Sequence, residues 1–137
     1  MEKNVNQKVS FDFDGTLEMK SVQEYAAELM WKQVEVFVTT SRFGDPEKYK
    51  KFFHTTTSVD VTNNDLYEIT DNLGIPCENI TFTNMEDKWK YVEEKGFRFH
   101  LDDDWIENEM INERRATKGI DFFGNPDWKE KCEKALL

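Results

Sequence analysis

The chain has 137 residues, of which 38% are hydrophobic, and a formal charge of -10. A chain of this length folds as one domain around one core, here expected over residues 1–137, and has no room for a second. The acidic charge excludes tight non-specific binding to nucleic acids and to anionic membranes, because both are polyanions.

The cysteines and the N-terminal residues indicate the cellular compartment of the protein. Cys77 and Cys132 form no Cys-x-x-Cys pair and are too few for a disulfide framework, which is typical of a reducing environment. Residues 1–7 lack the apolar centre of a signal peptide, and no run approaches the ~18 apolar residues of a membrane span. The sequence therefore predicts a cytoplasmic protein with no membrane partner, and it leaves the oligomeric state open.

Along the chain, runs of β-branched and aromatic residues alternate with segments whose apolar residues recur at helical spacing. The runs that predict strands are 8–12, 34–38, 80–82, 97–101 and 120–123. The segments that predict helices are 22–31, 46–53, the stretch from Asp65 to Gly74, 86–96, and the stretches after Asp104 and after Asn125-Pro126. This alternation predicts an α/β domain with a Rossmann-like, doubly wound, mainly parallel sheet of about five strands.

Capping patterns mark several helix starts. Asp45 before Pro46 is typical of an N-cap followed by proline in the first turn. Residues 55–62 fit an extended segment and a surface loop equally well, so this segment is left unassigned. Most Trp and Phe side chains are expected in the core. Three pairs have the spacing of a capping box: Ser21 with Glu24, Asp65 with Glu68, and Asp104 with Glu107.

The most specific pattern is Phe11-Asp12-Phe13-Asp14-Gly15, followed by Thr-Leu. On a strand, Asp12 and Asp14 share one side while the two phenylalanines pack on the other, and Gly15 lets the backbone turn away. Two carboxylates about 4 Å apart repel by ~1 kcal/mol in water and ~4 kcal/mol at the effective dielectric of a protein surface. A divalent cation offsets this repulsion, whereas Asp-Gly by itself is more typical of a solvated turn.

Polar residues follow several of the other predicted strands. Ligands in open parallel sheets bind beyond the carboxyl ends of the strands. There the chain carries residues 39–42 (Thr-Thr-Ser-Arg) after the second strand, Lys88 after the third and residues 102–104 (three Asp) after the fourth. Carboxylate oxygens suit magnesium better than zinc, and neither histidine has a metal-ligand neighbour. His100 is expected to be packed or hydrogen-bonded inside the fourth strand.

The string Asp-x-Asp-Gly-Thr from Asp12 resembles the first motif of the haloacid dehalogenase (HAD) phosphohydrolase superfamily, and the later polar groups stand in the order of its other three motifs. The resemblance implies that Asp12 attacks phosphorus and that Asp14 is the general acid and base. It also implies that the hydroxyl of Thr40 binds a phosphoryl oxygen and that Lys88 neutralises the phosphate. Two rivals stay open for these last roles: Thr39 and Lys90.

The same resemblance implies a magnesium ion bound by Asp12, by the carbonyl of Asp14 and by Asp102, with Asp103 bound directly or through water. The residues it implies for substrate contact are Gly15, Ser41 and Arg42. For Arg42, contact with a second phosphate and pairing with an acid are left as equal options.

The motif spacing leaves no room for a large cap domain. Between Asp14 and Thr40 lie one predicted helix and one strand, far fewer residues than the ~50 that a domain needs. Between Thr40 and Lys88 there is room for a small lid at most. The leading hypothesis is a magnesium-dependent phosphomonoesterase with an open site, acting on a nucleotide or a nucleic-acid terminal phosphate. The alternatives are a catalytically idle module that binds a phosphorylated ligand or a protein, and phosphotransfer to an acceptor other than water.

Overall fold

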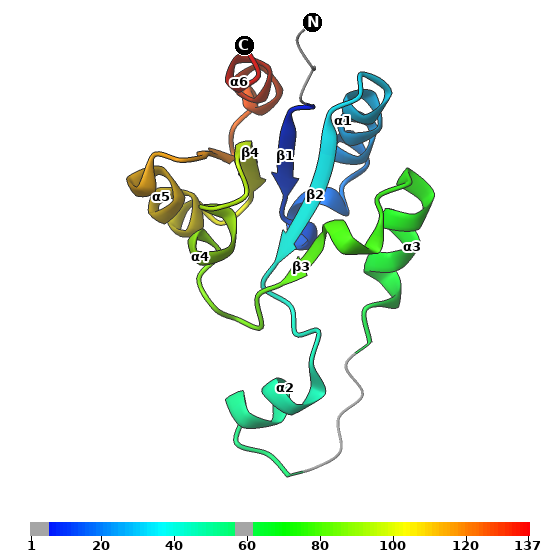
Figure 1. Ribbon diagram of the computed structural model, residues 1–137, viewed down its shortest axis with the longest axis vertical. Helices are drawn as coiled ribbons and strands as arrows, with labels where there is room; N and C mark the ends of the chain where they lie inside the picture. Colours follow the sequence, from blue (N-terminus) through cyan, green and yellow to red (C-terminus); the bar gives the residue numbers. More distant parts are fainter. Residues whose placement is uncertain (1–5, 57–61) are drawn as a thin grey trace, which may run out of the picture.

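The computed structural model describes residues 6–56 and 62–137, and these residues form a five-stranded sheet (Figure 1). The strands are β1 (Lys8–Phe11), β2 (Glu35–Thr40), β3 (Ile80–Phe82), β4 (Phe97–Asp102) and β5 (Lys118–Asp121). Their order is β3-β2-β1-β4-β5, and every neighbouring pair is parallel. The predicted α/β class with a parallel sheet of five strands is confirmed, and the order is Rossmann-like.

Helices cover both faces of this sheet (Figure 1). The helical elements are the irregular turn η1 (Phe13–Leu17), α1 (Lys20–Trp31), α2 (Pro46–Phe52), α3 (Asn64–Leu73), η2 (Cys77–Asn79), α4 (Trp89–Val92), α5 (Trp105–Arg114) and α6 (Trp128–Ala135). On one face α1 contacts α3, and the hydroxyl of Tyr25 on α1 donates to Glu133 on α6 over 2.9 Å. Because α4 and α5 pack together on the other face, the sheet is doubly wound.

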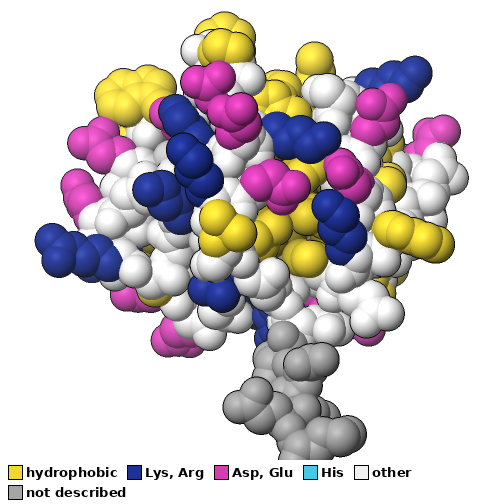
Figure 2. Space-filling model, turned by 90° about the horizontal axis from the view of Figure 1, so that it is seen from above, with side chains coloured by type: hydrophobic (Ala, Val, Ile, Leu, Met, Phe, Trp, Pro, Cys, Tyr) yellow, Lys and Arg dark blue, Asp and Glu magenta, His cyan; other side chains and the backbone are white. Residues whose placement is uncertain are grey.

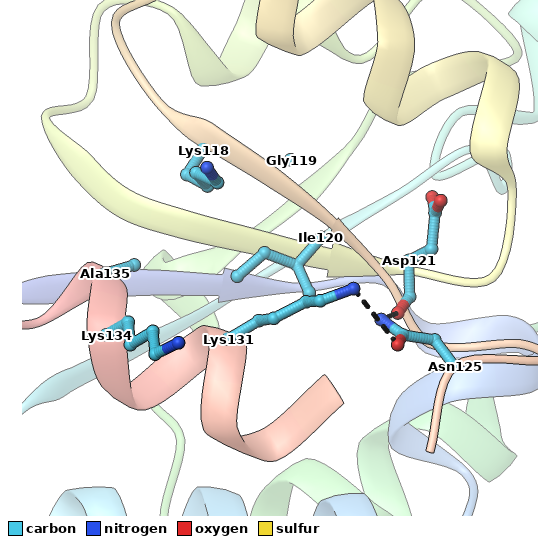
Figure 3. Close-up of a pocket in the computed structure, with 8 residues that line it drawn as sticks. All are labelled: Lys118, Gly119, Ile120, Asp121, Asn125, Lys131, Lys134 and Ala135. Atoms are coloured by element: carbon cyan, nitrogen blue, oxygen red, sulfur yellow. Dashed lines mark hydrogen bonds between the residues drawn. The ribbon is translucent and has the colours of Figure 1, made fainter. Parts of the chain in front are cut away.

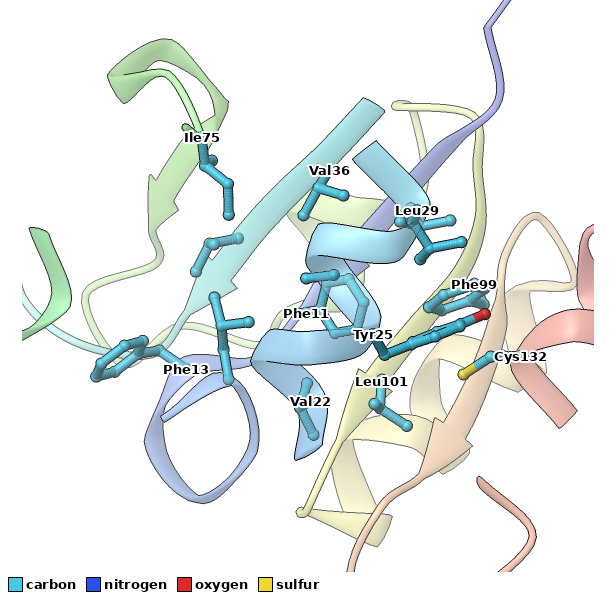
Figure 4. Close-up of a cluster of buried hydrophobic side chains, with 14 of the residues drawn as sticks. Phe11, Phe13, Val22, Tyr25, Leu29, Val36, Ile75, Phe99, Leu101 and Cys132 are labelled. Atoms are coloured by element: carbon cyan, nitrogen blue, oxygen red, sulfur yellow. The ribbon is translucent and has the colours of Figure 1, made fainter. Parts of the chain in front are cut away.

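The larger core lies between the sheet and α1, α3 and α6 (Figure 4). Phe11 of β1 and Phe99 of β4 meet edge to face with ring centroids 5.7 Å apart, and Tyr25 of α1 stacks on Phe99. All three side chains are buried, and each large apolar side chain removed from water contributes roughly 1.5–3 kcal/mol. The alternation along β1 and β4 therefore points these rings at α1.

On the second face a bulge in β4 separates one apolar side chain from the polar positions that follow it. Lys8 pairs with Phe97, whereas Ser10 pairs with His100, so β4 contains one extra residue between these two pairs. The extra residue turns Phe97 toward α4 and α5, where it packs with Val92 and Ile111. The next positions on this face are polar and buried, and they lead toward the carboxyl end of the sheet.

The capping predictions hold in part. The side chains of Asp45 and Asp104 accept hydrogen bonds from the first turns of α2 and α5, as expected. The other two predictions are wrong: Met19 precedes α1 and Asn63 precedes α3, and neither makes a side-chain capping bond. In both cases the helix begins one residue before the predicted cap residue.

Three element boundaries also differ from the prediction. α4 is a single turn at Trp89–Val92 instead of a helix over 86–96. β5 lies two residues earlier than predicted, and α6 begins at Trp128. Most of the unassigned segment 55–62 lies outside the described residues, which stop at 56 and resume at 62.

Most Trp and Phe side chains are buried or pack against the core, as expected, but several lie on the surface. Trp31, Trp105 and Phe123 are 87%, 62% and 81% exposed. The face seen in Figure 2 carries acidic and basic side chains close together, with hydrophobic side chains between them. Within residues 6–56 and 62–137, no helix combines the length and the apolar character that crossing a membrane requires.

Candidate active site

The acidic motifs meet where β1 and β4 lie side by side. The chain proceeds from β1 to β2 and β3 in one direction and continues from β4 to β5 in the other, so the strand order reverses between β1 and β4. Such a reversal is the usual ligand position in an open parallel sheet. Asp12, directly after β1, donates its backbone N–H to Leu101 O over 2.8 Å. One carboxylate oxygen from each of Asp12, Asp102 and Asp103 lies within 4.8 Å of the other two.

Lys88 joins two of these carboxylates. Its Nζ donates to Asp12 Oδ1 over 2.7 Å and to Asp102 Oδ2 over 2.6 Å, and all three side chains are buried. Burial works against the charge of Lys88, but the two carboxylates raise its pKa above the ordinary lysine value. The rival Lys90 is exposed, with Nζ 6.0 Å from the ring of Trp89. Of the two lysines, Lys88 is therefore the one in the acidic cluster.

The cluster carries more negative than positive charge. Burial, together with the charge of Asp102, raises the pKa of Asp12 well above the ordinary range despite Lys88. Burial also opposes ionisation of Asp102, yet the hydrogen bond from His100 and the charge of Lys88 lower its pKa. Burial raises the pKa of Asp103. When all three acids are ionised, they outnumber the one ammonium, and a divalent cation would balance the excess negative charge and so favour the ionised forms.

A buried polar chain extends from the cluster across three strands. His100 Nε2 lies 2.7 Å from Asp102 Oδ2, and its Nδ1 lies 2.9 Å from Ser10 Oγ. Burial lowers the pKa of His100, so its ring is neutral, and an ionised Asp102 requires the proton on Nε2. Ser10 then donates to Nδ1, and Thr39, 2.8 Å away, donates to Ser10. The prediction that His100 is hydrogen-bonded is confirmed.

Arg42 pairs with two acids. Its guanidinium donates to both carboxylate oxygens of Asp14 over 2.8 and 2.9 Å and to both of Asp65 over 2.7 and 2.8 Å, and it lies 4.8 Å from the ring centroid of Phe13. The hydrogen bond from Arg42 lowers the pKa of Asp65 to about 2. Of the two options left open by the sequence, the structure contains the ion pair, and the side chain of Asp14 faces Arg42.

The three hydroxyl residues after β2 occupy different environments. The hydroxyl of Thr39 belongs to the chain of hydrogen bonds that ends at Asp102, and the buried Thr40 Oγ1 accepts from the backbone N–H of Arg42 over 3.3 Å. Ser41 lines the cavity that holds the acids. The structure thus places Ser41 at the cavity wall, whereas Thr40 is buried and is not one of the residues that line the cavity.

Gly15 meets two requirements that no other residue meets easily. Its φ of +76° lies in the left-handed region, and a Cβ at this position would collide with the carboxylate of Asp103. Its backbone N–H donates to Glu18 Oε1 over 2.6 Å. The glycine therefore allows the turn after β1 and the tip after β4 to approach each other.

These groups line a cavity of about 430 Å³ at the carboxyl end of the sheet. The lining residues are Asp12, Asp14, Ser41, Lys88, Asp102, Asp103, Asp104 and Trp105. A second cavity of similar volume lies between β5 and α6 (Figure 3). There Lys131 donates to Asn125 over 3.2 Å, and the lining includes Lys118 and Lys134 but none of the residues predicted for the site.

Sequence reasoning missed three residues near the site. Asp65 binds Arg42, and Trp105 lines the cavity. Glu107 accepts a hydrogen bond from the backbone N–H of Lys88 over 2.9 Å, whereas the capping-box spacing predicted a bond back to Asp104. The backbone N–H of Asp104 donates to Asp102 Oδ1 instead. The only sequence feature that could have indicated Trp105 as a cavity residue is its position directly after three aspartates.

The donor set fits magnesium. All three candidate ligands are carboxylates, the hard oxygen donors that magnesium prefers. Asp12 Oδ2 and Asp102 Oδ1 are not the oxygens bound to Lys88; they accept from Thr16 Oγ1 and from the backbone N–H of Asp104. Each of the two residues therefore retains an oxygen that could contact an ion while Lys88 stays in place.

The fold and the site together define an α/β protein with a Rossmann-like parallel sheet and a partly buried acidic cluster at the point where the strand order reverses. One lysine, Lys88, bridges two of the acids. Comparison with known proteins adds no relative: no family model, no curated protein and no solved structure matches the chain.

Proposed function

We propose that the protein is a magnesium-dependent phosphohydrolase of the HAD type that cleaves phosphate monoesters. One observation carries the proposal: Asp12 lies at the reversal of strand order, 2.7 Å from the ammonium of Lys88 and grouped with Asp102 and Asp103. A carboxylate nucleophile beside a cation and further acids is the arrangement that phosphoryl transfer through an aspartyl phosphate requires.

In the proposed reaction an oxygen of Asp12 attacks phosphorus, and the bond from phosphorus to the leaving oxygen breaks. Asp14 donates its proton to that leaving oxygen, which departs as an alcohol. Asp14 then accepts a proton from water, and the water oxygen attacks the aspartyl phosphate to release phosphate and regenerate Asp12. Lys88 balances phosphoryl charge, and the Thr40 and Ser41 hydroxyls with the backbone at Gly15 are the proposed donors to phosphoryl oxygens.

Magnesium bound by Asp12, Asp102, Asp103 and the carbonyl of Asp14 would supply charge neutralisation at the phosphoryl oxygens. The role of Asp14 requires its carboxylate to leave Arg42, to which it makes two hydrogen bonds. Its side chain is 51% exposed, so a rotation about its own side-chain bonds meets little packing resistance. Arg42, once released, can contact the substrate phosphate.

The proposed substrate is a nucleotide or the terminal phosphate of a nucleic acid. The cavity opens beyond the end of the sheet, and of the described helices α2 lies farthest beyond that end (Figure 1). The charge of -10 favours the smaller of the two substrates.

A second candidate function is binding without turnover. The observation that favours it is the ion pair of Asp14 with Arg42, which is also held by Asp65. A protein whose proton donor stays in this pair would bind a phosphorylated ligand and not hydrolyse it.

A phosphatase screen tests the proposal. Wild-type protein with magnesium should hydrolyse at least one phosphate monoester, and Asp12→Asn should lower kcat/KM by at least about a thousandfold. The matched control is Asp71→Asn, because Asp71 is an exposed acid on α3 outside the site. Turnover by Asp12→Asn at the wild-type rate, with thermal unfolding unchanged, would refute the mechanism. Ligand binding with no turnover on any ester would favour the binding function.

A further inference from the structure

Trp105 is a large apolar side chain that lines the acidic cavity and stays exposed. Its indole is 62% exposed, although it lies on the wall shared with Asp12, Lys88 and Asp102. Within residues 6–56 and 62–137 its ring has no aromatic or cationic partner. Two of the other three tryptophans have one: Trp128 meets Tyr25 edge to face, and Trp89 stacks against Arg114 at 3.7 Å.

The backbone beneath Trp105 is held rigidly to the acidic cluster. Trp105 is the first residue of α5, and Asp104 caps that helix by accepting from Ile106 N over 3.0 Å. The backbone N–H of Asp104 donates to Asp102 over 3.0 Å, and Glu107 accepts from Lys88 one turn later. The backbone of Trp105 is thus held at a set position relative to the proposed nucleophile, so that only rotation of the side chain is lost when a ligand stacks on the indole.

The charge of the cavity restricts what can stack there. Five aspartates and a single lysine line it, so the lining remains negative after one divalent cation has bound. A leaving group with further negative charges is repelled, whereas a neutral aromatic group gains both stacking and removal of apolar surface from water. A volume of about 430 Å³ lies within the ~300–1,000 Å³ of small-ligand sites.

From these contacts we infer that Trp105 forms a leaving-group subsite that stacks a neutral aromatic ring, as carried by a nucleoside monophosphate or an aryl phosphate. The inference rests on the proposed phosphatase activity and narrows its substrate class. It selects the monophosphate of a nucleoside over nucleoside triphosphates and over the phosphorylated end of an oligonucleotide.

The first arm of the test compares esters that differ in the leaving group. Wild-type protein with magnesium should prefer adenosine 5′-monophosphate and phenyl phosphate over glycerol phosphate and over adenosine 5′-triphosphate. Trp105→Ala should lower the preference for the aromatic monoesters over glycerol phosphate by about tenfold, equivalent to ~1.4 kcal/mol. Trp105→Phe should keep most of it. Trp31→Ala is the control, because Trp31 is 87% exposed at the far end of α1 and outside the cavity.

The second arm needs neither magnesium nor turnover. Adenosine, which carries no phosphate, is added to metal-free protein while the indole N–H resonances are followed by NMR. The Trp105 resonance should shift, and that of Trp31 should stay. A shift without hydrolysis of any ester would support the subsite and count against the proposed function. Hydrolysis without aromatic preference, or an unshifted Trp105 resonance, would overturn the subsite and leave the phosphatase proposal standing.

Discussion

At the scale of single residues, Lys88 decides the electrostatics of the site. It is the partner of two buried carboxylates, and its own amide is held by Glu107. A buried ion pair adds little to the free energy of unfolding compared with well-packed apolar groups of the same volume. Removing one of its partners, however, leaves a buried charge without compensation. Lys88 is therefore important to folding as well as to the proposed chemistry.

We predict that Lys88→Met lowers the free energy of unfolding by about 3–5 kcal/mol, because Asp12 and Asp102 lose their shared cation. Urea denaturation measures this change. Lys90→Met is the matched control: Lys90 is exposed two residues away, and its change should stay within about 0.5 kcal/mol. Equal losses in the two variants would mean that Lys88 is not the charge partner of the cluster.

Arg42 and Asp65 give a pH-dependent contribution to stability. The pKa of Asp65 falls from 3.8 to about 2 in the folded protein, so the folded state binds its proton less readily than the unfolded state. The stabilisation is present above about pH 4 and is lost as the pH falls toward 2. Both side chains are partly exposed, which limits its size to that of a surface pair.

Asp65→Asn should therefore lower the free energy of unfolding at pH 7 by less than about 1 kcal/mol. The difference between wild type and variant should shrink as the pH is lowered from 4 toward 2, because wild-type Asp65 becomes protonated. Urea denaturation at a series of pH values measures it, with Asp71→Asn as a variant that shows no such trend. A difference that grows with acidity would contradict the assigned sign.

At the scale of elements, a polar chain ties three strands together. Thr39 on β2, Ser10 on β1 and His100 on β4 form successive hydrogen bonds that end at Asp102. All of these side chains are buried, so each bond satisfies a group that has no access to water. The chain replaces apolar packing on this part of the sheet and fixes the orientation of one proposed metal ligand.

His100→Leu should lower the free energy of unfolding by about 2–4 kcal/mol, since Ser10 and Asp102 each lose a buried partner at ~1–3 kcal/mol. Adding Ser10→Ala should cost less in the His100→Leu background than in wild type, because the hydroxyl there is already unsatisfied. A double-mutant cycle measured by urea denaturation provides the comparison. Strictly additive effects would show that the two side chains are not coupled.

α5 is positioned by a glycine on the neighbouring strand. A Cβ at Gly119 of β5 would lie 2.8 Å from the backbone oxygen of Asn108, so only glycine lets α5 approach β5 this closely. The side-chain amide of Asn112 donates to Gly119 O and accepts from Gly119 N–H. These two bonds satisfy backbone groups on the open edge of β5. This packing places the first turn of α5, with Asp104 and Trp105, beside the acidic cluster.

At the scale of the whole molecule, the acidic charge and the acidic cluster act together. The chain carries a charge of -10, and three of its carboxylates converge at one end of the sheet. A cation that binds there binds only the folded state, because the unfolded chain does not bring the three residues together. Cation binding should therefore stabilise the fold by mass action.

Magnesium should raise the thermal midpoint by several degrees once its concentration exceeds the dissociation constant about a hundredfold, equivalent to ~2.7 kcal/mol. Sodium chloride at equal ionic strength is the required control, because screening of the net charge alone also stabilises the fold. Asp103→Asn should remove most of the magnesium-specific shift, and Asp71→Asn should keep it. Equal shifts in magnesium and in matched sodium chloride would argue against a specific cation site.

Local sequence patterns are enough to predict the order of the strands and helices and the polar residues at the carboxyl ends of the strands. Alternation of β-branched runs with amphipathic segments is a local property, and so are the caps at Asp45 and Asp104, which the structure contains. The predicted boundaries of α4 and β5 were wrong: α4 is a single turn, and β5 takes its bounds from pairing with β4, which is a long-range contact.

Only the tertiary structure decided which polar residues share the site. Parallel pairing of β1 with β4 brings Asp12 beside Asp102, although 90 residues separate the paired positions Ser10 and His100. The tertiary structure also places Lys88, and not Lys90, in the acidic cluster, and it pairs Asp14 with Arg42. Trp105 lines the cavity and stays exposed. These outcomes depend on long-range packing, and spacing along the chain carries no information about which distant side chains fill the same volume.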